Sequence, residues 1–278
     1  MLPLWSDRLH IVLAPDKVSM VRMSSGLQVR ELLNKSINCA ELEAGQPLWQ
    51  PALQAMQKLL TVAGGKADVK VMLSSHFVRY VLVPVQVDLK DEAEEEAYVR
   101  FCFSEVYGAE AADWTLRWNG PLAVDQQIAS AIDSSLLSGI EQAMRSVNKR
   151  LSSVQPYLMS AFNLVRKHMQ ADEQWFVLVE SGNACLSSFT QGECTSLRTV
   201  RLDDDWQQTL PRLLAREFLI AGADNKSRDL LLCAPQHVDL GALQLKGWNM
   251  RALTITANAL LKGKFTPAGM TGGMHARA

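Results

Sequence analysis

Polar side chains with chemical potential separate two very apolar runs in the first third of the chain. Ser74, Ser75 and His76 stand between residues 68–73 and residues 77–85, both rich in valine and leucine. Open α/β sheets place their ligand crevice at the carboxyl ends of their strands, so this break is the first position to consider for a site. His76 is suited to act as a general base or to bind a ligand. An exposed loop histidine without a chemical role is the competing interpretation.

Two other groups of residues have types that could support catalysis. Cys185 and His168 are a nucleophile and a base, but the sequence supplies neither an oxyanion turn nor a third group around them. Residues 91–96 carry five carboxylates, which could form a metal site or a catalytic pair. Carboxylates at the start of a helix also complement its dipole and face water, and we favour that interpretation. No pattern in the chain therefore compels an enzyme.

Charge and cysteine content restrict the class of protein. The formal net charge is -1, and neither half carries the basic excess that binding to a phosphate backbone requires, so nucleic acid is not expected as a partner. The five cysteines are widely spaced without a CxxC or Cys/His metal spacing, which is typical of reduced thiols. The start of the chain is too short and polar for a secretory signal, and no apolar run approaches the roughly 18 residues that span a bilayer. The sequence predicts a soluble cytosolic protein.

Apolar periodicity and turn residues predict an alternation of strands and helices in the first half. Strands are expected at 9–13, 18–23, 35–41, 69–73, 77–85, 114–118, 127–132 and 151–155. Helices are expected at 48–62, 91–107, 134–150 and 156–169. Pro84 cannot donate to a ladder, so it marks a strand end or a sheet edge. The very apolar strand at 69–73 should lie in the middle of a sheet with both faces covered.

The pattern begins again near residue 174. Strands are expected at 175–179, 184–189, 195–202, 230–233 and 250–255, with a helix at 205–221. Three antiparallel strands, a helix and two further strands also open the chain. The architecture is therefore predicted to be duplicated, although no residue repeat is visible.

This order of elements resembles the actin-like ATPases, and within them PilM and the cytoplasmic domain of GspL (MshI-like proteins). The best local matches are residues 71–84, a strand followed by Arg79 and a strand ending in proline, and residues 152–166, a strand, a proline and an Ala-Phe helix. The resemblance implies an α/β, duplicated RNase H-like fold with two lobes. The expected parts are a first lobe at 1–170 with an inserted subdomain at about 77–124, a second lobe at 171–265, and a flexible tail at 266–278.

Family members hold ATP with Mg between the lobes, on two hairpin turns with small residues that let backbone N–H groups approach phosphate. The residues that the resemblance places at the remnants of these turns are Asp16, Lys17, Glu180, Ser181 and Gly182. Pro15 removes a donor from the first turn, and residues 233–236 replace a late Gly-Gly turn. A degenerate site without a cofactor is therefore expected, and an active ATPase is the alternative.

The resemblance also implies a role in assembly. PilM-like and GspL-like proteins sit at the cytoplasmic base of type IV pilus or type II secretion machines and grip short cytosolic tails of membrane proteins. Phe77, Arg79 and Tyr80 stand near the family's tail-binding lobe and are the candidate partner-binding residues. Packing of all three against the helix at 91–107 is an equally weighted alternative. Homo-oligomerisation and an unrelated soluble enzyme are left open.

Overall fold

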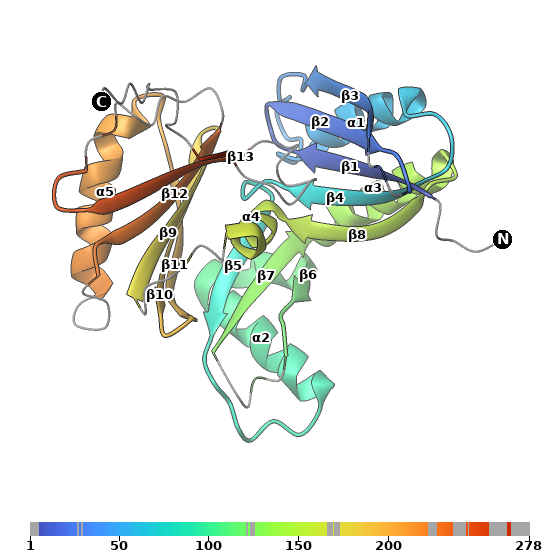
Figure 1. The fold of residues 1–278 in the computed structure, drawn as a ribbon. Helices are drawn as coiled ribbons and strands as arrows, with labels where there is room; N and C mark the ends of the chain where they lie inside the picture. Colours follow the sequence, from blue (N-terminus) through green and yellow to red (C-terminus); the bar gives the residue numbers. More distant parts are fainter. Residues whose placement is uncertain are drawn as a thin grey trace, which may run out of the picture. The chain divides into compact units, whose positions relative to one another are not determined.

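The computed structural model describes most of the chain as two compact units, residues 1–160 and 161–278. The described residues are 6–26, 28, 30–120, 122, 126–165, 169, 173–221, 227–235, 243, 245–255 and 266–267. Each unit contains its own main sheet (Figure 1). Within the described residues, no helix has both the length and the apolar character needed to cross a bilayer.

The main sheet of the first unit has the strand order β3-β2-β1-β4-β8. Its strands are β1 (Asp7–Leu13), β2 (Lys17–Met23), β3 (Glu31–Asn38), β4 (Ala67–Leu73) and β8 (Arg150–Pro156). The first three are antiparallel, whereas β1, β4 and β8 run parallel. The predicted interior position of the strand at 69–73 is confirmed. Only one of its faces is fully covered, because Lys70 on the other face is exposed. β3 begins earlier than the predicted strand at 35–41.

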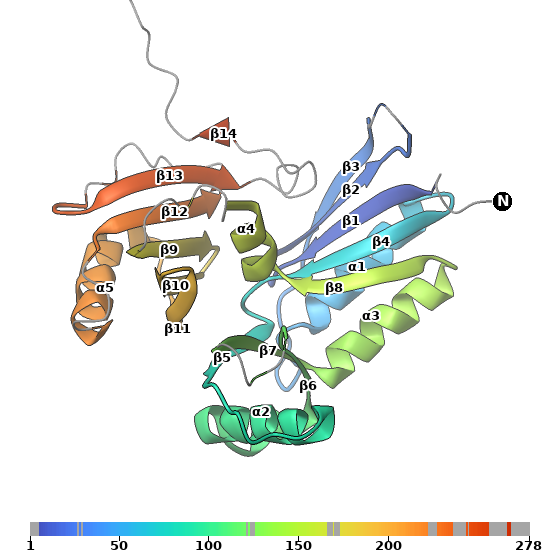
Figure 2. The ribbon, with the colours of Figure 1, turned by 60° about the horizontal axis from the view of Figure 1, so that its bottom comes forward.

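Two helices cover one face of this sheet, α1 (Gln50–Val62) and α3 (Ser134–Ser146) (Figure 2). The chain leaves α1 through Gly64 and Gly65, which adopt φ angles of 51° and 45°, values that glycine reaches without steric cost. Gly139 lets α3 approach α1, because a Cβ at that position would lie 2.5 Å from a methyl carbon of Leu53.

A separate three-stranded antiparallel sheet lies between β4 and α3 in the sequence. It has the order β5-β7-β6, with β5 (Val78–Val83), β6 (Trp114–Arg117) and β7 (Gln127–Asp133). α2 (Glu92–Tyr107) and a 3-10 helix (Gly108–Asp113) pack on one face through Val99, Phe103 and Ala111. β5 is one of the two outer strands and ends before Pro84, as the proline predicted.

The second unit repeats the plan of the first main sheet. Its strands are β9 (Glu173–Glu180), β10 (Asn183–Thr190), β11 (Glu193–Arg201), β12 (Asp229–Pro235), β13 (Asn249–Ile255) and β14 (Thr266–Pro267), in the order β11-β10-β9-β12-β13-β14. β9 to β11 are antiparallel and β12 is parallel to β9. The predicted duplication is thereby confirmed. Of the predicted tail at 266–278, residues 268–278 lie outside the described part.

Two further helices belong to this half of the chain. α5 (Trp206–Ala221) covers one face of the six-stranded sheet (Figure 2). Phe162, on α4 (Tyr157–Val165), stacks on Phe189 at 4.8 Å and meets Phe176 edge-on at 5.9 Å. Both faces of the interior strand β9 are consequently buried.

Candidate functional site

A cavity of about 320 Å³ opens in the first unit along β8. One wall is β8 itself, and the opposite wall is a face of the three-stranded sheet. α3 contributes Leu137 and Glu141, and Leu73 at the end of β4 completes the lining. We call this cavity the β8 groove; the residues of its two walls are Leu151, Ser152, Ser153, Val154, Gln155 and Pro156, and Thr115, Arg117, Ser130 and Ile132.

β8 presents hydrogen-bonding groups to the groove because it is the outer strand of the described main sheet. Its pairing with β4 shifts register between Val69 and Lys70. Ser152 stands at this irregularity, and its hydroxyl donates to the carbonyl oxygen of Val69 at 2.7 Å. The hydroxyl of Ser153 is buried and has no hydrogen-bond partner among the described residues. This hydroxyl is closed to a ligand in the groove, which would instead meet the outer-strand backbone groups of β8.

The opposite wall is polar and carries one cation. Thr115 is directly opposite Ile132, and Arg117 is directly opposite Ser130, so all four side chains project from one face of the sheet. The guanidinium of Arg117 donates to the carbonyl of Leu116 at 3.0 Å, and the residue is exposed. Its remaining donors suit a carboxylate or a carbonyl oxygen.

The structure places the predicted partner-binding residues beside this wall. Phe77 and Tyr80 are buried, with 7% and 6% of their surface exposed. Tyr80 is opposite Ser130 and shares its face, which is the groove face. Arg79 alternates to the other face, and its guanidinium donates to the carbonyls of His76 and Val78 at 3.1 and 3.3 Å. Their role in binding a partner stays a prediction.

The polar break at 74–76 forms a tight buried turn between the two sheets. Ser74 donates its N–H to the carbonyl of Leu13 at 2.9 Å, and Phe77 donates to the carbonyl of Ser74 at 2.9 Å. The hydroxyl of Ser74 accepts from the N–H of His76 at 3.3 Å. Ser74 and Ser75 are each 1% exposed, so these serines are parts of the turn and are not open to solvent.

The acidic start of α2 has local structural partners. Asp91 caps the helix by accepting from the N–H groups of Ala93 and Glu94 at 3.0 and 2.9 Å. Glu95 accepts from Trp118 Nε1 at 3.3 Å, and Glu96 pairs with Arg100 at 3.0 Å. Among the described residues, no group of three or more His, Cys, Asp or Glu side chains is arranged to hold a metal ion. The helix cap and the contacts of Glu95 and Glu96 are what support the structural interpretation of these carboxylates.

The first remnant turn, between β1 and β2, uses its backbone groups internally. The N–H of Ala14 donates to the carbonyl of Lys17 at 3.1 Å, and the carbonyl of Asp16 accepts from the N–H of Cys39 at 2.8 Å. Pro15 has no N–H to offer. The side chains of Asp16 and Lys17 are exposed. The turn thus presents few backbone donors to an anion.

The second remnant turn, between β9 and β10, is a two-residue hairpin loop. Gly182 has a φ angle of 72°, and its carbonyl accepts from the N–H of Leu202 at 3.1 Å. Ser181 is exposed, while Glu180 is half-buried at the end of β9. Cys185, which follows on β10, is buried, and its sulfur lies 3.6 Å from the hydroxyl of Thr199. His168, its suggested base, lies outside the described residues.

Solved structures share this architecture at low sequence identity. A Bacteroides thetaiotaomicron protein with an actin-like ATPase fold and unknown function matches with a TM-score of 0.54 and 11% identity over 87% of each chain. The chain has the actin-like ATPase fold. The predicted fold class is therefore confirmed. No protein-family model matches this sequence, and no curated protein does.

Two further actin-like neighbours belong to the groups that the sequence resembles. The cytoplasmic domain of EpsL, an inner membrane component of the type II secretion system of Vibrio cholerae, has a TM-score of 0.61 and 12% identity, covering 93% of this chain and 94% of that chain. A chain of the PilM-PilN type IV pilus biogenesis complex has a TM-score of 0.65 and 14% identity, covering 92% of this chain and 89% of that chain. The resemblance to PilM and to the GspL cytoplasmic domain is confirmed at the level of the fold.

Sequence reasoning missed the β8 groove. Arg117 and Ser153 lie on two short predicted strands of different sheets, and no local spacing brings them together. The signal that could have found the groove was Arg117, an arginine on an otherwise apolar predicted strand. At the level of the sequence, an arginine in such a position was considered as a binding residue only at Arg79.

Proposed function

We propose that this protein is an assembly subunit that holds an extended cytosolic tail of a membrane protein in the β8 groove. The observation that carries the proposal is the cavity between the outer strand β8 and the polar face of the three-stranded sheet. Its volume lies at the lower end of the range of about 300–1,000 Å³ for binding sites. An extended peptide that adds to an outer strand gains backbone hydrogen bonds, and neighbouring pockets select its side chains.

The lining defines the chemistry of such a tail. Leu137 and Val154, which are half-buried, offer apolar contact to one or two aliphatic side chains of the tail. Arg117 suits an acidic side chain or a tail carbonyl, and the outer-strand backbone groups of β8 suit the peptide groups of the tail. A short, mixed apolar and polar segment fits this surface better than a uniformly charged one.

The neighbours support the cellular setting of this proposal. One is part of a type IV pilus biogenesis complex with PilN, and the other is the cytoplasmic domain of an inner membrane secretion component. We place the protein in the cytoplasm, bound at the inner membrane through its partner, in a pilus or secretion machine of this kind. The predicted inserted subdomain at about 77–124 supplies Thr115 and Arg117 to one wall of the groove, and β7, which follows it, supplies Ser130 and Ile132.

The same proposal includes a degenerate nucleotide site. The residues at the first turn do not fit a phosphate, because Pro15 lacks an N–H and the N–H of Ala14 is already paired. An active ATP-binding protein is the competing function. The glycine hairpin at Gly182 is the observation in its favour, since its positive φ suits a close backbone approach.

Photo-crosslinking in the native host tests the proposal. A benzoylphenylalanine at position 152, exposed on the groove wall, should crosslink to a protein with a membrane-spanning segment. Mass spectrometry should locate the crosslink in the cytosolic tail of that protein. A synthetic peptide of the tail should then bind the purified protein in fluorescence anisotropy.

Matched variants separate the groove from other surfaces. Arg117→Glu replaces the positive charge of the groove by a negative one, and Ser130→Trp fills the cavity. Each variant should abolish the crosslink and lower the affinity for the peptide by at least about tenfold. Arg79→Ala serves as the control, because Arg79 lies on the opposite face of the same sheet. Loss of binding in Arg79→Ala but not in Arg117→Glu would transfer the site to the β5 edge and overturn the groove assignment.

A further inference from the structure

The outward face of α5 combines basic and large apolar side chains. Leu219 is 79% exposed and Ile220 is 58% exposed, both in the last turn of the helix. Arg212 and Arg216 precede them at helical spacing, so the four side chains are neighbours on one surface. Ala215 is exposed beside them. We call these five residues the α5 face.

The opposite face of α5 is the one that packs against the sheet, which leaves the α5 face exposed. Leu210 and Leu214 pack into the core of the second unit, where Trp206, Leu213 and Phe218 also contribute. Glu217, the acidic residue within α5, is 3% exposed on the inward side. It accepts hydrogen bonds from the guanidinium of Arg198 on β11 at 3.1 and 3.4 Å. The apolar side chains of the inward face are thus packed in the core, and the negative charge of Glu217 is balanced by Arg198.

The α5 face therefore carries a local positive charge. Neither Arg212 nor Arg216 forms an ion pair within the described part of the chain. The acidic residues 203–205 stand before the start of the helix, and Arg212, the nearer of the two arginines, is seven residues beyond Asp205, about 10 Å along the axis. That separation exceeds the screening length of about 8 Å at physiological salt.

We propose that the α5 face lies on an anionic lipid surface. Leu219 and Ile220 would enter the boundary between headgroups and acyl chains, while Arg212 and Arg216 contact lipid phosphates. The choice of a lipid occupant rests on charge, because α2 provides a counter-example within the same chain. α2 also exposes Phe101 and Val106, but the exposed acidic residue Glu105 adjoins Val106, and the first turns of α2 are acidic as well. An anionic surface therefore favours α5 and repels α2.

This contact is separate from the proposed tail-binding function. The β8 groove belongs to the first unit, whereas the α5 face belongs to the second. A protein that failed to bind a tail would still bind lipid through α5. Conversely, variants of the α5 face should leave the anisotropy of a groove-bound peptide unchanged.

Vesicle flotation with the purified full chain tests the inference. The protein should float with vesicles of phosphatidylcholine and phosphatidylglycerol, remain at the bottom with phosphatidylcholine alone, and detach as salt is raised. Arg212→Gln with Arg216→Gln should lower the partition coefficient by about 30-fold. Leu219→Gln with Ile220→Gln should lower it by at least about tenfold. Phe101→Gln with Val106→Gln is the matched control and should float like the wild type.

Three results would overturn the inference. The wild type could fail to float with anionic vesicles at low salt, or the two α5 variants could float as well as the control. The third result is a dimer in sedimentation experiments without lipid. If Leu219→Gln with Ile220→Gln dissociates that dimer, the α5 face binds a second copy of the chain instead of lipid. Circular dichroism and thermal melting confirm that each variant is folded before its result is used.

Discussion

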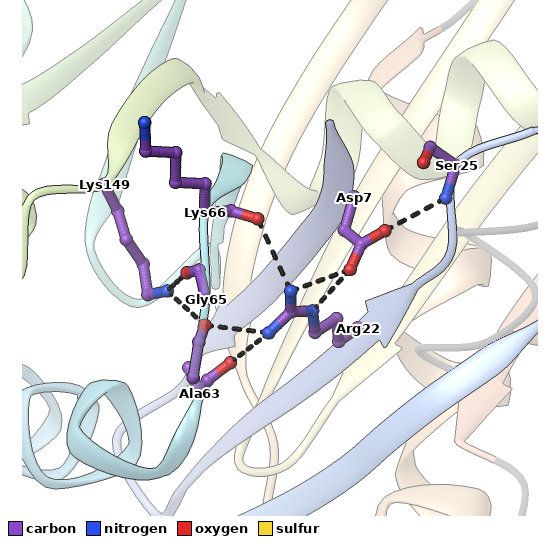
Figure 3. Close-up of polar contacts among 8 residues, drawn as sticks. Asp7, Arg22, Ser25, Ala63, Gly65, Lys66 and Lys149 are labelled. Carbon is purple, nitrogen blue, oxygen red and sulfur yellow. Dashed lines mark hydrogen bonds and ion pairs between the residues drawn. The ribbon is translucent and has the colours of Figure 1, made fainter. Parts of the chain in front are cut away.

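Arg22 and Lys149 donate hydrogen bonds to the same backbone oxygen, the carbonyl of Gly64, at 2.7 and 2.8 Å. Figure 3 shows both side chains converging on the chain that leaves α1, where Arg22 also donates to Ala63 at 2.6 Å and pairs with Asp7 at 2.7 Å. Carbonyls at the end of a helix lack intrahelical partners and favour cations. Burial and the nearby Arg22 lower the pKa of Lys149. The two cations fix the end of α1 to the main sheet.

Arg22→Ala should lower the free energy of unfolding by about 2–3 kcal/mol, because the substitution leaves the carboxylate of Asp7 and the carbonyl of Ala63 without their charged donor. Urea denaturation followed by circular dichroism measures the change. Arg79→Ala is a suitable control, since the hydrogen bonds of Arg79 within the described residues go to carbonyls near its own position in the chain. If the control lost as much stability as Arg22→Ala, the network would have no special structural role.

ATP with magnesium should not bind at micromolar concentration. Each backbone donor missing from the first turn costs roughly 1 kcal/mol or more, which is about a fivefold or greater loss in affinity. Isothermal titration calorimetry on the purified protein measures this directly. Micromolar binding that Gly182→Val abolishes would instead establish the active ATP-binding function.

His10 should make the protein less stable in mild acid. Burial, Lys70 and Arg8 lower the pKa of His10 to about 4 in the folded state, from the ordinary histidine value of 6.5. Below pH 6.5 the unfolded chain therefore binds more protons at His10 than the folded chain does. The contribution of the neutral ring to the free energy of unfolding is present above pH 6.5 and is lost as pH falls towards 4. We expect a loss of about 1–2 kcal/mol for this half-buried ring.

Urea midpoints measured from pH 7 to pH 4 test this expectation, with His10→Asn as the comparison. The variant should have a shallower pH dependence over this range, because carboxylate titration is common to both proteins. Parallel curves for the two proteins would show that His10 does not contribute.

The cysteines should divide into two reactivity groups. Burial raises the pKa of Cys194 to about 12 and also raises that of Cys233, so both remain protonated and shielded at pH 8. Cys39 and Cys102 are half-buried and should alkylate first, although their pKa values are also raised by burial. Mass spectrometry of timed iodoacetamide reactions should show Cys185, Cys194 and Cys233 reacting only after denaturation.

The spacing of apolar residues predicted most of the strands and helices, because burial of one face of a strand or helix requires apolar residues at a regular spacing in the sequence. Pro84 marked the edge position of β5, and the apolar run at 69–73 marked the interior strand β4. The start of β3 was missed because this outer strand is mostly exposed and shows no clear alternation. The duplicated order of elements was sufficient to indicate the fold.

The candidate groove could not be predicted in the same way, because its walls come from strands that are distant in sequence. Arg117 and Ser153 meet only when β8 joins the main sheet and β6 joins β7. Ser74 illustrates the opposite error. A polar residue at a strand end suggested a site, but its N–H and carbonyl serve the turn through Leu13 and Phe77.

The position of β8 next to β4 also determines the order in which this chain can fold. The two strands are parallel neighbours, yet residues 74–149 lie between them in the sequence. Closing so long a loop has an entropic cost that grows with the logarithm of its length, and non-local pairing slows folding. The three-stranded sheet and α2 lie within that loop and have their own apolar core. Folding of this insert first would bring β7 and α3 close to the sheet, so β8 should be the last strand of the first unit to gain protection from hydrogen exchange.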